Sequence, residues 1–163
     1  MNFSQPRSNW LIVATLFLAL VLMILPLPSW ISWFRPQWVL LVLIFWGLAL
    51  PNRVGLFAAW GSGLALDVLQ NTVLGEHALV FTVVAYFVLR FQTRINFFPF
   101  WQKTAVILSL ILLNNILQFW LERMLGNSAI SGWYWLSAIP TLLFWPWVEM
   151  MLQHWQRRFV VRN

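Results

Sequence analysis

Long apolar runs separated by short polar boundaries are the main pattern of this chain. A helix that crosses a bilayer needs ~20 largely apolar residues. Six such segments follow one another, and we predict spans at about 10–27, 34–51, 54–73, 75–92, 101–124 and 133–155. The pattern therefore predicts an all-α polytopic membrane protein with six transmembrane helices, in which residues 1–163 form a single integral membrane domain.

Two of the predicted spans are irregular. The second lies between Pro36 and Pro51, and it is short enough that it must recruit residues 31–34 or sit in a thinned bilayer. The sixth contains Pro140 and Pro146. We expect both prolines to bend it, because proline removes a backbone donor and clashes with the preceding turn.

Composition supports the membrane class. Hydrophobic residues make up 61% of the chain and charged residues only 9%, against ~45–50% and ~25% in soluble domains. The 13 Trp and 14 Phe fit a membrane protein, since Trp gathers where hydrocarbon meets headgroups. Cys is absent, which excludes disulfides and thiolate chemistry. The net charge of +6 comes from bases at segment ends, so it indicates topology rather than nucleic-acid binding.

The basic residues also predict an orientation. With six spans both termini share one side, and that side would hold eight bases against two on the other (Arg7, Arg53, Arg90, Arg94, Lys103, Arg157, Arg158 and Arg162 against Arg35 and Arg123). Basic loops stay in the cytoplasm. We therefore expect a multi-pass protein of the bacterial inner membrane with both termini in the cytoplasm.

The third span carries small residues on one face. Gly55, Ala59, Gly63 and Asp67 follow at four-residue spacing, which places them on one side of a helix. Small residues let another helix approach closely. This face of small residues indicates either packing within the chain or docking of a partner's transmembrane helix.

Asp67 is the one acidic residue well inside an apolar run. A charge at the bilayer centre costs about 2.5–3.5 kcal/mol on insertion scales, so such residues are functional candidates when a partner can be named. We expect the partner to be Arg35 or Arg123, both predicted near the outer surface. The alternative is a structural pair or a helix-end carboxylate near water.

The fifth span has a polar stripe on an otherwise apolar helix. Asn114, Gln118 and Glu122 follow at four-residue spacing, with Asn115 beside them. These side chains must face protein or water rather than lipid, and we interpret them mainly as hydrogen-bonding contacts between helices. The predicted topology also gathers three acids and three basic side chains toward the outer side, and leaves Glu149 toward the inner side (Asp67, Glu76 and Glu122 near Arg35, Arg123 and His77).

No catalytic pattern emerges from the sequence. His77 and His154 lack the neighbouring ligands that a zinc site needs, and no glycine-rich loop precedes a Walker lysine. Asp67 has no second acid in a facing span. We predict a non-enzymatic chain without metal or cofactor.

Several short stretches resemble the rod shape-determining protein MreD family of Gram-negative bacteria. They are FRPQWVLL at 34–41, LPNRVG at 50–55, GSGLALD at 61–67, LG at 74–75 and, less distinctively, WPW at 145–147. The positions that carry the resemblance are Arg35, Pro36, Gly63, Asp67 and Gly75. Together with the small-residue face of the third span and the polar stripe of the fifth, these positions give the candidate partner-binding or structural residues: Arg35, Pro36, Gly55, Ala59, Gly63, Asp67, Gly75 and Glu122.

The resemblance implies a scaffold rather than an enzyme. Members of the family are non-catalytic inner-membrane subunits of the cell-elongation machinery, or elongasome. They bind MreC and, through it, join MreB, RodA and the elongation transpeptidase, which support lateral peptidoglycan synthesis and rod cell shape. Their fold is similar to the six-helix substrate-binding subunits of energy-coupling-factor transporters.

Two other functions stay open. The first is a solute-binding membrane subunit of a vitamin-type transporter, with the outer polar cluster as its pocket. Such subunits often carry alanines four apart on the first helix, whereas Ala14 and Ala19 are five apart here. The second, a lipid-handling enzyme or flippase, would need an acid–base pair at membrane depth, which the sequence does not offer.

Overall fold

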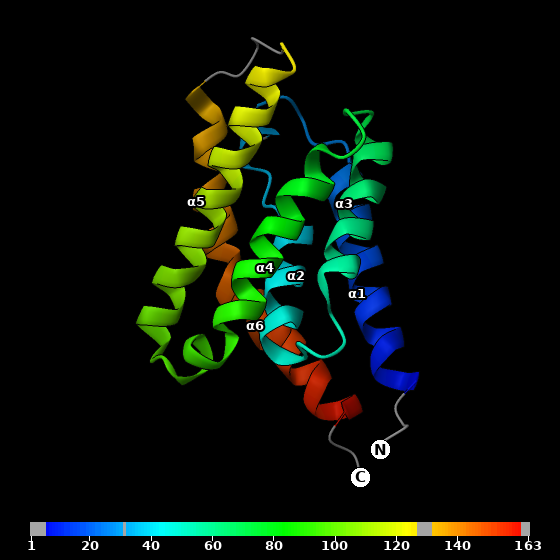
Figure 1. Cartoon of the computed structure of the whole chain (residues 1–163), viewed down its shortest axis with the longest axis vertical. Coiled ribbons are helices and arrows are strands. Elements are labelled where there is room, and N and C mark those ends of the chain that lie inside the picture. The colour runs from blue at the N-terminus through cyan, green and yellow to red at the C-terminus, as the bar shows by residue number, and fades with distance from the viewer. Residues whose placement is uncertain (1–5, 31, 127–131, 161–163) are drawn as a thin grey trace.

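A computed structural model describes residues 6–30, 32–126 and 132–160 of the chain (Figure 1). Within these residues the chain forms six α-helices and two short 3-10 helices, without strands: α1 (Pro6–Ile24), η1 (Ser32–Phe34), α2 (Trp38–Ala49), α3 (Leu56–Gln70), α4 (Glu76–Phe97), α5 (Phe100–Met124), η2 (Gly132–Ser137) and α6 (Ala138–Val160). The prediction of an all-α chain with six main helices is confirmed.

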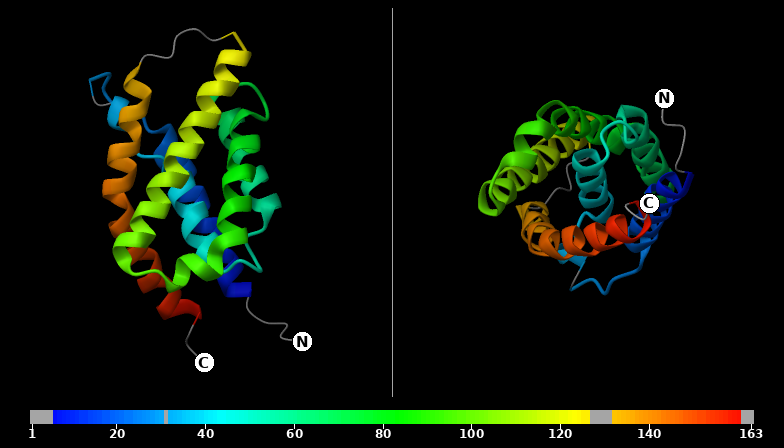
Figure 2. Two further views of the ribbon diagram at one scale, coloured as in Figure 1. Left: turned by 60° about the vertical axis from the view of Figure 1, so that its left-hand side comes forward. Right: turned by 90° about the horizontal axis from the view of Figure 1, so that it is seen from below.

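Helix α2 forms the centre of the molecule, and the other five helices surround it (Figure 2). Ten consecutive residues, Val39–Leu48, are buried. A helix that is apolar on all sides is stable where protein or lipid surrounds it, and protein surrounds this 12-residue segment inside the bundle. Because protein encloses α2, its length does not have to match the hydrocarbon layer. Residues 32–34 do not lengthen it either, since they form η1, and Ile31 lies outside the described residues.

Polar side chains from neighbouring helices hold α2 in place. The indole Nε1 of Trp46 donates to Thr15 Oγ1 of α1 at 2.9 Å. Near the carboxyl end of α2, the Leu48 carbonyl accepts a hydrogen bond of 3.0 Å from Asn96 Nδ2 of α4. Carbonyls in the last turn of a helix have no partner within it, so this contact stabilises the end of the central helix.

Two helices, α4 and α5, are long and apolar enough to cross a membrane by length and composition. Asn9–Ile24 of α1, α2 and α3 are apolar but shorter. The six helices lie within or near the six predicted segments, while the crossing of a bilayer by each of them stays a prediction.

The sixth segment differs from its prediction at its start. It begins with the 3-10 helix η2, and α6 proper starts only at Ala138. Pro140 therefore lies in the first turn of α6, where the missing N–H would have no helical partner anyway. Only Pro146 is inside the helix, so only that proline removes an internal hydrogen bond.

The amino end of α1 and the carboxyl end of α6 lie at one end of the bundle, which we call the terminal end (Figure 1). At the opposite end, the distal end, the carboxyl ends of α3 and α5 meet the amino end of α4. On the side of the terminal end, Lys103 of α5 pairs with Glu149 of α6, which Gln153 also contacts. The acids other than Glu149 all belong to the distal end.

Candidate functional site

The carboxylate of Asp67 is the centre of the distal end. Asp67 is in the last turn of α3 and is fully buried. Its Oδ1 accepts hydrogen bonds from Thr72 Oγ1 at 3.0 Å and from the backbone N–H of His77 at 3.0 Å, and its Oδ2 accepts one from Gly75 N–H at 2.9 Å. The Ala78 N–H lies at 3.5 Å from Oδ2. One side chain therefore fixes the whole turn between α3 and α4.

This arrangement caps α4 from another helix. The first N–H groups of a helix lack internal partners and carry partial positive charge. Gly75 precedes α4 at a φ of 99°, a left-handed conformation that favours glycine, and it has no side chain to act as a cap. The carboxylate of Asp67 replaces that missing cap. This explains why Gly75 and Asp67 both appear among the sequence candidates.

His77 is the side-chain partner of Asp67. Its Nδ1 lies 2.7 Å from Asp67 Oδ1, and its ring meets Phe81 edge to face with centroids 5.9 Å apart. The pair carries opposite charges only when the imidazole is protonated. His77 is itself buried, so the pair belongs to the interior of the α3–α4 contact.

Two further carboxyl groups lie at the distal end, one on α4 and one on α5. Glu76 is the first residue of α4 and Glu122 is in the last turn of α5, and the two carboxyl groups lie close enough to interact electrostatically. The expected gathering of Asp67, Glu76 and Glu122 near His77 is thus present in the structure.

The two arginines do not belong to this cluster, so the predicted partners of Asp67 are wrong. Arg35 donates to the carbonyls of Met23 and Leu25 at 2.8 and 3.0 Å. It thereby satisfies the carboxyl end of α1, where carbonyls lack helical partners. Arg123 lies over the ring of Phe119, 5.1 Å from its centroid. The predicted topology placed both arginines on the same side of the membrane as Asp67, but it could not say which groups their side chains contact.

The small-residue face of α3 packs within the chain. A Cβ on Gly63 would lie 2.4 Å from the Ala78 Cα of α4, so the two helix backbones touch there. Ala59 on the same face is fully buried. Gly55 precedes α3 as its N-cap, and a Cβ there would meet nothing within 4 Å. The Ala59–Gly63 part of this face is therefore filled by the protein itself and is not open to a partner's helix.

The polar stripe of α5 faces the core, as expected. Asn114 and Asn115 are fully buried and Gln118 nearly so. Gln37, just before α2, bridges both asparagines: its Nε2 donates to Asn115 Oδ1 at 2.7 Å, and its Oε1 accepts from Asn114 Nδ2 at 2.9 Å. The Gln37 N–H donates to Thr141 Oγ1 of α6. This network joins α2, α5 and α6.

Pro36 and Gln37 form the entry to α2. Pro36 is buried, and its carbonyl accepts a hydrogen bond of 3.0 Å from the Trp38 N–H. Sequence reasoning missed Gln37, Thr72 and the role of His77. Thr72 and His77 follow Asp67 within ten residues, so a search for caps across the α3–α4 turn could have found them. The role of Gln37 had no such local signal, because its partners are 77 or more residues away.

The fold and the site define a class: a helical, membrane-associated protein whose buried polar groups connect helices to one another. The family model for rod shape-determining protein MreD matches residues 5–155. The chain is also 27% identical over 151 residues to the rod shape-determining protein MreD of Haemophilus influenzae (strain Rd). The aligned region covers 92% of this chain and 93% of that protein. The chain belongs to the MreD family, as its short motifs indicated, and it has a role in the rod-shape system.

Membership also bears on two other expectations. The family consists of shape-determining proteins and is not a known enzyme family, in agreement with the prediction of a non-enzymatic chain. No solved structure matches the chain. The expected likeness to the substrate-binding subunits of energy-coupling-factor transporters therefore has no support from solved structures.

Proposed function

We propose that this protein is a non-catalytic scaffold subunit of the rod complex in the bacterial inner membrane. It spans the membrane several times with both termini in the cytoplasm. It binds MreC and, through MreC, joins MreB, RodA and the elongation transpeptidase. In this way it supports lateral peptidoglycan synthesis and rod cell shape.

The observation that carries this proposal is the use of the buried polar groups. The Asp67 carboxylate is engaged by the amino end of α4, and Gln37 connects α2 to the asparagines of α5. These contacts fix helices relative to one another, and a binding surface is most precise when it is built on such fixed helices. Membership in a shape-determining family supports the same conclusion.

Large apolar side chains cover the outside of this framework. Phe57 of α3, Trp120 of α5 and Trp147 of α6 are 89%, 63% and 74% exposed. In a membrane, such side chains contact lipid or another protein. The three helices present different faces of the bundle (Figure 2), so these positions can report which face meets MreC.

Co-purification with MreC from detergent-extracted membranes tests the proposal. We expect wild-type protein to retain MreC, and Gly63→Leu and Asp67→Ala to lose it together with rod shape, because both changes disturb the α3–α4 contact. Ser109→Ala is the matched control, since Ser109 is exposed and bonds only its own helix. Failure of wild-type protein to retain MreC would overturn the proposal. Retention of MreC and of rod shape by both α3 variants would show that the α3–α4 framework has no role in binding.

The absence of native cysteine allows the binding face and the topology to be mapped with single cysteines. Cross-linkable cysteines at Phe57, Trp120 and Trp147 should give an adduct with MreC on one face and not on the others. An impermeant maleimide should label a cysteine at Ser29 in intact cells and should not label one at Asn163. Labelling at Asn163 would contradict cytoplasmic termini.

One observation favours the alternative, a solute-binding subunit of a vitamin-type transporter. Among the described residues, Asn114 Oδ1, Asn115 Nδ2 and Trp145 Nε1 are buried polar atoms without a hydrogen-bond partner. Buried polar atoms usually have partners, and a small polar solute could supply them. Mass spectrometry of the purified protein decides between the two functions. A tightly bound vitamin would support the transporter subunit. Wild-type protein that carries no vitamin and retains MreC would support the scaffold.

A further inference from the structure

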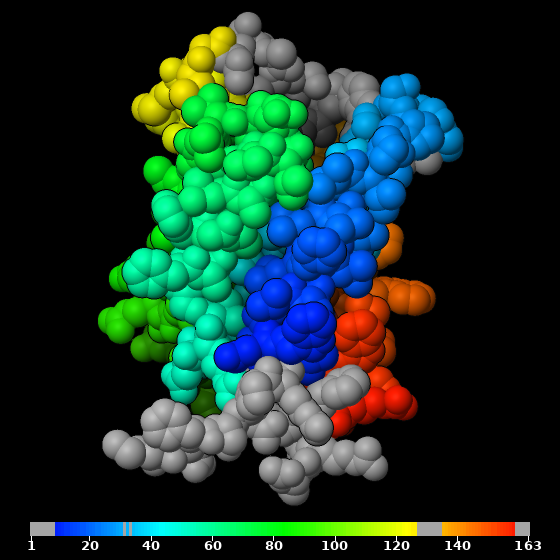
Figure 3. All heavy atoms as spheres, turned by 90° about the vertical axis from the view of Figure 1, so that its right-hand side faces the viewer, coloured from blue at the N-terminus to red at the C-terminus, as the bar shows by residue number. Residues whose placement is uncertain are grey.

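A groove runs between α1 and α3, which lie side by side on one face of the molecule (Figure 3). Its volume is about 830 Å³, within the range of ligand sites, ~300–1,000 Å³. The α1 wall is apolar and includes Ile12, Val13, Leu16 and Phe17. Val13 and Phe17 are 60% and 67% exposed. The wall thus offers apolar surface that the chain itself does not cover.

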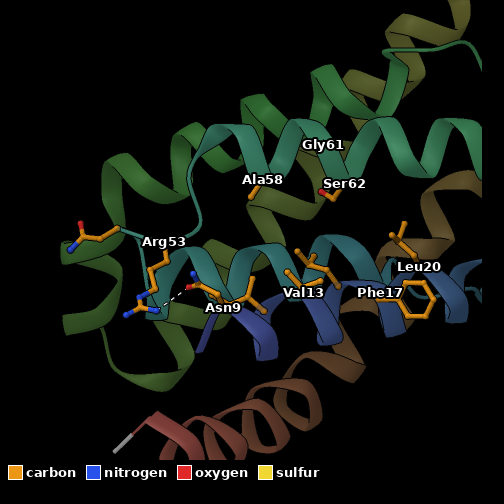
Figure 4. Close-up of a pocket in the computed structure, with 11 residues that line it drawn as sticks. Asn9, Val13, Phe17, Leu20, Arg53, Ala58, Gly61 and Ser62 are labelled. Carbon is orange, nitrogen blue, oxygen red and sulfur yellow. Dashed lines mark hydrogen bonds between the residues drawn. The ribbon is translucent and has the colours of Figure 1, made fainter. Parts of the chain in front are cut away.

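The α3 wall is made of small residues. Ala58, Gly61 and Ser62 line it, and Figure 4 shows them across the groove from Val13 and Phe17. A Cβ on Gly61 would meet nothing within 4 Å, in contrast to Gly63, which touches α4. The groove is therefore distinct from the small-residue face that α4 fills.

One end of the groove is polar. Asn9 of α1 and Asn52 and Arg53 of the α2–α3 loop line this end, and Arg53 Nη1 donates to Asn9 Oδ1 at 2.9 Å (Figure 4). Asn52 and Arg53 are exposed. Arginine binds phosphate oxygens through planar, charge-assisted hydrogen bonds. An anionic group at this end would thus meet a complementary charge, whereas the rest of the groove would take an apolar chain.

The length of the groove indicates the kind of occupant. Its α1 wall extends from Asn9 to Leu20, which is ~16 Å at 1.5 Å per residue. The hydrocarbon core of a bilayer is ~30 Å thick, so one leaflet is ~15 Å deep. A transmembrane helix would run the full thickness, whereas an acyl chain occupies one leaflet. The groove therefore matches a lipid of the leaflet on the side of Arg53.

We infer that the α1–α3 groove binds one anionic phospholipid, with an acyl chain along Val13, Phe17 and Gly61 and its phosphate beside Arg53 and Asn9. The site lies outside the distal cluster and does not depend on MreC binding. It gives the weakly packed α1–α3 face a defined lipid contact in place of a protein neighbour.

Native mass spectrometry of the full-length protein, delipidated in detergent and then mixed with phosphatidylglycerol or phosphatidylcholine, tests this inference. We expect wild-type protein to bind one phosphatidylglycerol in preference to phosphatidylcholine. Arg53→Gln should weaken phosphatidylglycerol binding roughly fivefold, as expected for one basic residue near a lipid surface. Gly61→Leu should lower occupancy by both lipids, because its side chain fills the groove.

Matched variants lie elsewhere on the surface. Arg90→Gln removes the same charge at an exposed position of α4, and Ala105→Leu adds bulk at an exposed position of α5. Both variants should bind lipid like wild type. Val13→Trp fills the groove from the α1 wall and replaces Gly61→Leu if that variant does not fold. Unchanged lipid binding in Arg53→Gln and in a groove-filling variant would overturn the inference. The inference would also be overturned if a groove-filling variant lost MreC but bound lipid like wild type. That result would assign the groove to a partner's helix.

Discussion

Replacing Asp67 with alanine is the most direct test of how the distal end is built. The substitution removes both carboxylate oxygens from a fully buried position. It takes away the acceptor of the Thr72 hydroxyl and of the Gly75 and His77 N–H groups. It also removes the anion from the amino end of α4.

The magnitude follows from these contacts. Loss of a helix cap costs about 0.5–2 kcal/mol, and a buried N–H left without a partner, here that of His77, costs about 1–3 kcal/mol. The two contributions overlap, so we expect a loss of about 2–4 kcal/mol in the free energy of unfolding. Thr72→Val removes one hydrogen bond to the same carboxylate and should cost only about 0.5–1.5 kcal/mol.

Thermal unfolding in detergent, followed by the fluorescence of the 13 tryptophans, measures this difference. In a chain of this size 1 kcal/mol corresponds to a shift of roughly 2–4 °C, so Asp67→Ala should lower the midpoint by roughly 5–15 °C. Ser109→Ala should change it little, because an exposed substitution of this kind stays within about 0.5 kcal/mol.

The reasoning is refuted if Asp67→Ala unfolds within 2 °C of Ser109→Ala, a margin set by roughly 2–4 °C per kcal/mol. A double-mutant cycle with Thr72→Val adds a second criterion. Since the Thr72 hydroxyl bonds Asp67 Oδ1, Thr72→Val should cost nothing more once Asp67 is alanine. Fully additive losses would show that the two side chains do not interact.

Substitutions at four further positions separate packing from hydrogen bonding. Gly63→Ala should destabilise the protein by about 1–3 kcal/mol, since its Cβ would meet the α4 backbone. Gly61→Ala has open space and should instead stabilise the helix by about 0.5–1 kcal/mol, and paired midpoints of unfolding check this difference. Gln37→Leu should cost about 1–3 kcal/mol because it leaves the α5 asparagine amides without their partner, and an unchanged midpoint would contradict the α2–α5 network. Trp46→Phe should cost about 1 kcal/mol through loss of the bond to Thr15, and equal destabilisation by Trp46→Phe in a Thr15→Val background would contradict that contact.

Much of the helical arrangement could be predicted from the sequence, because apolar run length and boundary charges are local properties. The gathering of Asp67, Glu76, His77 and Glu122 could also be predicted, since the chain returns to the same end of the bundle after an even number of helices, here α4 and α5. The partners within that end could not. Arg35 lies in the same predicted layer as Asp67 but satisfies α1 carbonyls, and only the positions of α1 and α4 decide between the two contacts.

The glycines of α3 show the same division. Spacing places Gly63 and Ala59 on one face and marks that face as a contact for a helix. It does not say which helix, and the structure assigns the face to α4. Gly61, two residues from Gly63, faces the open groove instead, a difference that follows from about 200° of rotation around the helix axis.

The sequence by itself determined the all-α class, the six main helices, the family and the absence of a catalytic pattern, because composition, periodicity and short motifs are properties of neighbouring residues. Only the tertiary structure decided that α2 is the central helix, that Gln37 joins α2 to α5, and that a groove stays open between α1 and α3. Each of these depends on which helices become neighbours. That choice is made by packing between residues far apart in the chain, and no local pattern encodes it.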